Sequence, residues 1–210
     1  MMRFAFYAVA PAVFPFRAFK RLAAEPRPLR AAGRAVGFVG LLYFLTSAVM
    51  AMVGAVPMAT VLLLIRPENY YFWQMFFILP WVLLVWVLVS GLIHILEKRE
   101  RARPAFERTA AAAGVALAAS LFVAWVPSCL AAFLLTLGMS QQELVDVLSS
   151  PGGAQVLYVG LYLIAAVESV WLFVLAAEHG HHAKAGRPRQ VLIGGLAAAV
   201  LAGAFVLFVR

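Results

Sequence analysis

The stretch FWQMFFILPWVLLVWVLVSGLIHIL, residues 72–96, decides the fold class of this chain. His94 is its only acidic or basic residue, and it lies near the end of the segment. A membrane-spanning helix needs about 20 consecutive, mostly apolar residues, so this segment is long enough to cross a bilayer. Four further segments meet the same criterion. The predicted spans are residues 35–56, 72–96, 110–138, 154–177 and 191–209.

The composition of the whole chain agrees with a membrane protein. Hydrophobic residues make up 65% of its 210 residues and charged residues 12%, against about 45–50% and about 25% in soluble proteins. A chain of this size has too little interior to bury so much apolar surface, so lipid must cover the excess. The single cysteine excludes a disulfide scaffold. We expect an all-α integral membrane protein with five transmembrane helices.

The distribution of positive charge predicts the orientation. The net charge is +8, and all of the Lys and Arg residues except Arg66 and Arg210 fall on one side of a five-span arrangement. Positively charged loops stay in the cytoplasm. The sequence therefore predicts a multi-pass protein of the bacterial inner membrane, with a cytoplasmic N-terminus and an external C-terminus. Residues 1–34 form its basic cytoplasmic and interfacial segment.

An amphipathic helix is expected within this N-terminal segment. After Pro15, apolar residues recur at helical spacing, and basic residues occupy the other face. Such a helix lies on a membrane surface and attracts anionic lipid. We expect lipid head groups to contact Arg17, Lys20, Arg21, Arg27 and Arg30. The alternating charges of residues 97–101 suit a solvated helix end and disfavour nucleic-acid binding.

Two shorter segments have signals of their own. Residues 57–65 are apolar but too short to cross a bilayer, so they either extend the first helix beyond a bend at Gly54 and Pro57 or lie in the interface. Ser140-Gln141-Gln142-Glu143 fits a capping box. It predicts a short surface helix that Pro151-Gly152-Gly153 ends.

The chain also resembles a known family. The run Phe14-Pro15, Ala18-Phe19, Leu22 and Glu25-Pro26, followed by an apolar span, is similar to the opening of the Yip-domain proteins. These are five-span proteins named for their interaction with Ypt/Rab GTPases. The acidic cytosolic region of eukaryotic members does not precede this run, so the chain looks like a prokaryotic member. The resemblance implies the fold and a membrane-organising role, and it supplies no catalytic residues.

Glu168 is the first candidate functional residue, because it lies deep within the predicted fourth span. A carboxylate there costs several kcal/mol unless it is protonated, paired or hydrated, so it should face the bundle interior. Tyr158, Tyr162 and Ser169 share its side of the helix. One interpretation is a proton- or ion-coupling site of a transporter. The other is a neutral acid that locks helix packing through a hydrogen bond.

The histidines form the second candidate. His94 and Glu97 are neighbours on one helix face, and Glu178, His179, His181 and His182 end the fourth span. If these helix ends meet, they could bind a divalent metal such as zinc. Interfacial histidines that only cap helix ends give the same pattern.

From these features we expect a non-enzymatic protein that needs no cofactor. The expected role is membrane organisation through contact with anionic lipids and with a membrane-protein partner or a second copy of the chain. A transporter that uses Glu168 is the alternative. A membrane metal-binding protein or metalloenzyme at the His/Glu cluster is the third interpretation.

Overall fold

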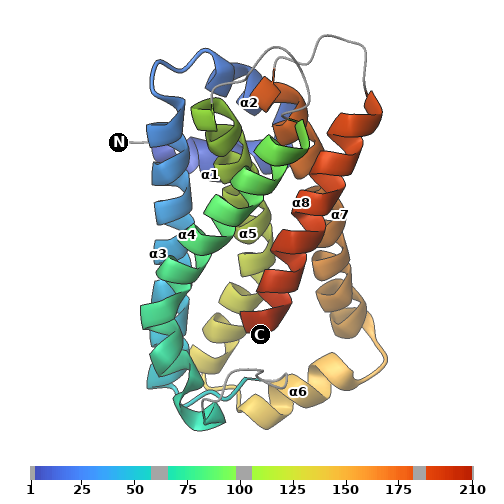
Figure 1. The fold of residues 1–210 in the computed structure, drawn as a ribbon. Coiled ribbons are helices and arrows are strands. Elements are labelled where there is room, and N and C mark those ends of the chain that lie inside the picture. Colours follow the sequence, from blue (N-terminus) through green and yellow to red (C-terminus); the bar gives the residue numbers. More distant parts are fainter. Residues whose placement is uncertain (1–2, 58–65, 98–105, 182–187, 210) are drawn as a thin grey trace.

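The computed structural model describes residues 3–57, 66–97, 106–181 and 188–209. Within these ranges the chain forms helices and no strand. The helices are α1 (Arg3–Val13), α2 (Pro15–Ala23), α3 (Pro28–Met52), the 3₁₀ turn η1 (Pro67–Asn69), α4 (Tyr70–Glu97), α5 (Phe106–Thr136), α6 (Gln141–Ser149), α7 (Gly153–His181) and α8 (Pro188–Val209). Figure 1 shows the long helices as a bundle, with α2 and α6 at its opposite ends.

Four helices are long and apolar enough to cross a membrane, namely α3, α4, α5 and α7. The prediction of an all-helical fold is confirmed for the described residues, and the four apolar helices are consistent with the predicted multi-pass membrane protein. In α8 the apolar stretch Val191–Ala204 is shorter than the other four, so the fifth crossing and the orientation stay predictions. Several helices extend one to seven residues beyond their predicted bounds. The largest such extension is in α3, which begins at Pro28 and not at the predicted residue 35. Proline suits this first helical position because its missing N–H needs no partner there.

The end of α3 differs from one expectation. The helix stops at Met52, and Gly54 adopts a φ of +67°, a conformation that glycine tolerates best. The first helix therefore does not continue unbroken through the predicted bend at Gly54. Residues 58–65 lie outside the described part of the chain.

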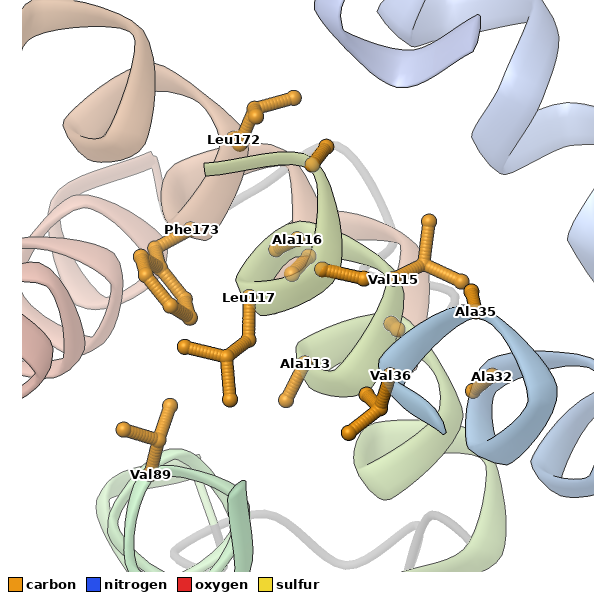
Figure 2. Close-up of a cluster of buried hydrophobic side chains, with 14 of the residues drawn as sticks. Ala32, Ala35, Val36, Val89, Ala113, Val115, Ala116, Leu117, Leu172 and Phe173 are labelled. Carbon is orange, nitrogen blue, oxygen red and sulfur yellow. The ribbon is translucent and has the colours of Figure 1, made fainter. Parts of the chain in front are cut away.

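Helix α5 forms the centre of the bundle. Every residue from Thr109 to Leu121 is buried, because α1, α3, α4 and α7 all pack against this helix. Figure 2 shows Leu117 of α5 directed toward Val89 of α4 and Phe173 of α7. The run is rich in alanine and glycine, and small residues let helix backbones approach closely.

One glycine and one tryptophan show how close this approach is. A Cβ atom added to Gly114 would lie 2.6 Å from the Trp86 ring of α4. The same ring donates a hydrogen bond from Nε1 to the carbonyl oxygen of Ala110 at 2.7 Å. The indole therefore fills the space that the glycine leaves.

The bundle divides into two differently packed halves. The packed half contains the buried start of α5 and the end of α7. In the end of α7, Leu172, Phe173 and Leu175–Ala177 are buried. The exposed half contains the first part of α7 and the last part of α5, where large apolar side chains point outward. Val167 is 71% exposed and Phe133 is 58% exposed. In a bilayer, such side chains contact lipid.

Helix α6 closes the exposed half, and its start follows the prediction. The Ser140 hydroxyl accepts a hydrogen bond from the Glu143 backbone N–H at 3.2 Å. The Glu143 carboxylate accepts one from the Ser140 backbone N–H at 2.7 Å. The capping box predicted from the sequence is therefore confirmed. These hydrogen bonds hold the pKa of Glu143 below its usual value.

Candidate functional site

The helices α1 and α2 form a hairpin that packs on the packed half of the bundle. Helix α1 lies against α3 and α5, and α2 lies against α5 and α7. The Tyr7 hydroxyl of α1 donates a hydrogen bond to the Glu25 carboxylate at 3.2 Å. The Arg21 guanidinium of α2 lies 4.6 Å from the centre of the Phe6 ring, a cation–π distance. The two helices thus hold each other in place.

The amphipathic pattern predicted for α2 is present, but its apolar side has a different partner. Ala18, Phe19 and Leu22 are buried against protein and do not lie on lipid as expected. Phe16, which is 57% exposed, and Ala23 are exceptions, because both are exposed. The physical reason is that the start of α5 and the end of α7 offer an apolar surface, which the sequence pattern of α2 alone does not reveal.

The basic side of α2 is exposed, with the Arg21 guanidinium against Phe6 of α1. The five predicted lipid contacts share this property, and each side chain is exposed. They are Arg17, Lys20, Arg21, Arg27 and Arg30. The buried side of α2 fixes the orientation of Arg17, Lys20 and Arg21, whereas Arg27 and Arg30 belong to the start of α3. All five charges are therefore displayed together at one end of the bundle.

A pocket of about 320 Å³ lies beneath α2, and we call it the α2 pocket. It forms where α2, the start of α3, the start of α5 and the end of α7 meet. Its polar lining consists of Glu25, Glu107, Arg108 and His179, and its apolar lining consists of Phe19, Leu22, Ala23, Pro26, Pro28, Ala111 and Ala112. Of the four polar residues, His179 was predicted from the sequence. The other three come together only because α2 folds back on the bundle, which no local motif signals.

His179 is held on two sides. Its ring stacks on Phe19 of α2, with centroids 5.5 Å apart and planes at 29°. Its Nδ1 lies 3.0 Å from the carbonyl oxygen of Leu175. A carbonyl only accepts, so Nδ1 carries the hydrogen, and Nε2 is left for other contacts. The ring therefore joins α2 to α7 and lines the α2 pocket.

The predicted metal cluster is only partly described. His94 is half-buried and meets the Phe106 ring edge-on at 5.3 Å, while Glu178 is exposed. The side chains of Glu97 and His181, and all of His182, lie outside the described part of the chain. Within the described part, no three His, Cys, Asp or Glu side chains are grouped closely enough to hold a metal ion. The metal site stays a prediction.

Glu168 lies within α7, at the edge between its buried and exposed sides. The residue is half-buried. Its Oε1 atom is buried and makes no hydrogen bond within the described part of the chain. The Ser120 hydroxyl of α5 is likewise buried without a hydrogen bond there. Leu172 and Phe173 pack beside Val115–Leu117, so the antiparallel course of the two helices places Ser120 at about the level of Glu168.

The other predicted members of this site are placed as follows. The Tyr158 hydroxyl donates to the Tyr162 hydroxyl at 3.5 Å, and the two rings meet edge-on with centroids 5.0 Å apart. The Ser169 hydroxyl donates to the carbonyl oxygen of Ala165 at 2.6 Å. The structure thus brings the two tyrosines together and occupies the serine hydroxyl within its own helix.

Comparison of the chain with models of protein families, with curated proteins and with solved structures found no match.

Proposed function

We propose that this chain is a five-span protein of the bacterial inner membrane with a non-enzymatic, membrane-organising role. In this role its basic cytoplasmic end contacts anionic lipid. The observation that carries the proposal is the orientation of α2, whose apolar side packs on α5 and α7 while its basic side chains are exposed. A basic helix surface at the end of a transmembrane bundle meets the anionic head groups of the cytoplasmic leaflet.

The fifth span in this proposal is α8. The helix has 22 residues, which correspond to about 33 Å at 1.5 Å per residue, and this length matches the hydrocarbon core of a bilayer. With five crossings, α2 and the segments that precede α5 and α8 share the cytoplasmic side. The N-terminus is then inside and the C-terminus outside.

The resemblance to the Yip-domain family supports the organising role and adds a second kind of contact, with protein. A membrane-protein partner or a second copy of the chain would bind beside the lipid. The chain offers apolar helix faces for such contacts in the exposed half, but the basic side of α2 is the feature that an experiment can isolate.

The lipid contact is tested by native mass spectrometry of protein purified without a histidine tag. We expect phosphatidylglycerol and other anionic lipids to co-purify. In the triple variant Arg17→Gln/Lys20→Gln/Arg21→Gln, affinity for anionic membranes should fall by about 3 kcal/mol, or about a hundredfold, since each basic residue contributes about 1 kcal/mol.

The control for position is Arg66→Gln, which removes one positive charge from the segment before η1, at the opposite end of the bundle. This variant should retain anionic lipid as the unaltered chain does. Equal lipid retention by the triple variant and the control would contradict the proposal.

A second candidate function, transport, is favoured by the buried Glu168 Oε1 atom that lacks a hydrogen bond among the described residues. A carboxyl group inside a membrane is costly and often carries protons or ions. If the chain transports, Glu168→Gln should abolish a pH-dependent flux in proteoliposomes, while Ser169→Ala should preserve it. If the acid only supports packing, neither variant changes a flux, and Glu168→Gln alters stability alone.

A further inference from the structure

The α2 pocket carries an inference about which lipid the basic end selects. Its four polar residues include two carboxylates, Glu25 and Glu107, beside the Arg108 guanidinium and the His179 imidazole. The surrounding surface is strongly basic, since Arg17, Lys20 and Arg21 are all exposed on α2. Glu25 is half-buried and Glu107 is exposed. Carboxylates that line a pocket at this basic end suit a ligand that carries a positive charge as well as a negative one.

A single metal ion does not fit this arrangement. Glu25, Glu107 and His179 all line the pocket, yet within the described part of the chain no three such side chains are grouped closely enough to ligate one ion. The polar groups are instead spread around a volume of about 320 Å³. Pockets for small ligands begin at about this size. The lining therefore suits a small ligand whose two charges are separated.

The neighbouring apolar surface points to a lipid. Phe19 lines the pocket, and Phe16 lies one turn earlier on α2. The Phe16 ring meets Trp171 of α7 edge-on, with centroids 6.0 Å apart, and both side chains are exposed. Val167 and Ile164 continue this exposed apolar track along α7. A molecule with its polar end in the pocket has a path for an acyl chain along the side of the bundle.

We propose that the α2 pocket binds the phosphoethanolamine head group of a phospholipid, with an acyl chain along Phe16 and Trp171. The ammonium group donates hydrogen bonds to the carboxylates of Glu25 and Glu107. The phosphate accepts them from Arg108, whose guanidinium geometry matches phosphate oxygens. This inference rests on the proposed function, because it adds a selective head-group site to the lipid-binding end.

The test is native mass spectrometry of the full chain released from nanodiscs of phosphatidylethanolamine, phosphatidylcholine and phosphatidylglycerol. Phosphatidylcholine is the informative competitor because its trimethylated ammonium has no N–H to donate. We expect phosphatidylethanolamine to be retained about tenfold over phosphatidylcholine, as loss of hydrogen bonds to charged groups predicts. In Glu25→Gln/Glu107→Gln this ratio should fall to about one. Glutamine at position 25 still offers an oxygen to Tyr7.

A matched control removes two acids from the other end of the bundle. The variant Glu68→Gln/Asp146→Asn has the same change in net charge, and both residues are exposed there, so the head-group ratio should stay at about ten. Arg108→Gln should lower retention of both zwitterionic lipids and leave their ratio unchanged, because both carry the phosphate.

Three results would overturn the inference. They are equal retention of the two zwitterionic lipids by the unaltered chain, a persistent preference in Glu25→Gln/Glu107→Gln, and binding of soluble O-phosphoethanolamine as tight as that of the lipid. The last result would assign the pocket to a soluble ligand. The triple variant at positions 17, 20 and 21 separates this test from that of the proposed function, since it should lose phosphatidylglycerol and keep the phosphatidylethanolamine preference.

Discussion

The packed half and the exposed half of the bundle are built from similarly apolar sequence but use it differently. In the packed half, Phe173 is 0% exposed, and alanine and glycine of α5 let four other helices approach it. In the exposed half, large side chains such as Val167 point outward. Lipid is as apolar as these side chains, so transmembrane helices gain stability mainly from close packing. Small residues, more than large apolar ones, therefore determine where the helices of this bundle are held together.

The largest expected effect comes from emptying the packed half. Phe173→Ala removes a fully buried ring that packs with Leu117 and Val89 (Figure 2), and we expect it to lower stability by about 3–5 kcal/mol. Phe133→Ala is the matched variant in the exposed half and should change stability by less than about 1 kcal/mol. Thermal unfolding in detergent micelles measures both. Similar losses for the two variants would contradict the division into halves.

Glycine substitutions sharpen the same comparison. A Cβ atom at Gly195 of α8 would lie 2.5 Å from the Val174 Cα atom of α7, so Gly195→Ala must separate two backbones, at a cost of about 1–3 kcal/mol. Gly160 of α7 lies in the exposed half with nothing within 4 Å of an added Cβ atom. Gly160→Ala should be neutral or stabilise the helix by up to about 1 kcal/mol. The unfolding midpoints of the two variants should therefore move in different directions or by clearly different amounts.

The cap of α6 tests how independent the exposed half is. Ser140→Ala removes a hydroxyl that accepts from the Glu143 backbone and should cost about 1 kcal/mol in local stability. Hydrogen exchange of residues 141–149 should accelerate, while exchange in the buried part of α5 stays unchanged. Faster exchange throughout α5 would show instead that the two halves unfold as one unit.

The smallest expected effect is a pH dependence of the stability of α6. The pKa of Glu143 is lowered from its usual 4.5 by hydrogen bonds from Ser140. A carboxyl group with a lowered folded-state pKa stabilises the fold above its unfolded pKa, and this contribution is lost as the pH falls through the folded value. The protection of residues 141–149 against exchange, expressed relative to an unstructured peptide at the same pH, should therefore fall below about pH 4.5, and Ser140→Ala should weaken this dependence.

The sequence predicted the fold better than the packing. Long apolar segments and the Ser140–Glu143 pattern are local signals, and the corresponding helices and cap are present. The docking of α2 was not predictable, because the amphipathic pattern does not say whether Phe19 meets lipid or protein. The same limit explains the α2 pocket, in which Glu25 meets Glu107 and Arg108 from a distant part of the sequence.

The surroundings of Glu168 were only partly predictable from the sequence. Its position in an apolar segment was enough to single it out, and its Oε1 atom is indeed buried. The sequence did not indicate that Ser120 lies at about the same depth on α5, because this depends on the register between two antiparallel helices. That register is set by the small residues of α5 and by the side chains of α7 that pack on them.

The proposed function depends most on which side of the membrane each end of the bundle occupies, and site-specific labelling determines this orientation. In a Cys129→Ala background, single cysteines are placed by Lys20→Cys, Glu143→Cys and Arg210→Cys, and intact cells are treated with a membrane-impermeant thiol reagent. Five crossings with a cytoplasmic basic end predict labelling at positions 143 and 210, and labelling at position 20 only after the membrane is permeabilised. Labelling of positions 20 and 210 from the same side would contradict the account.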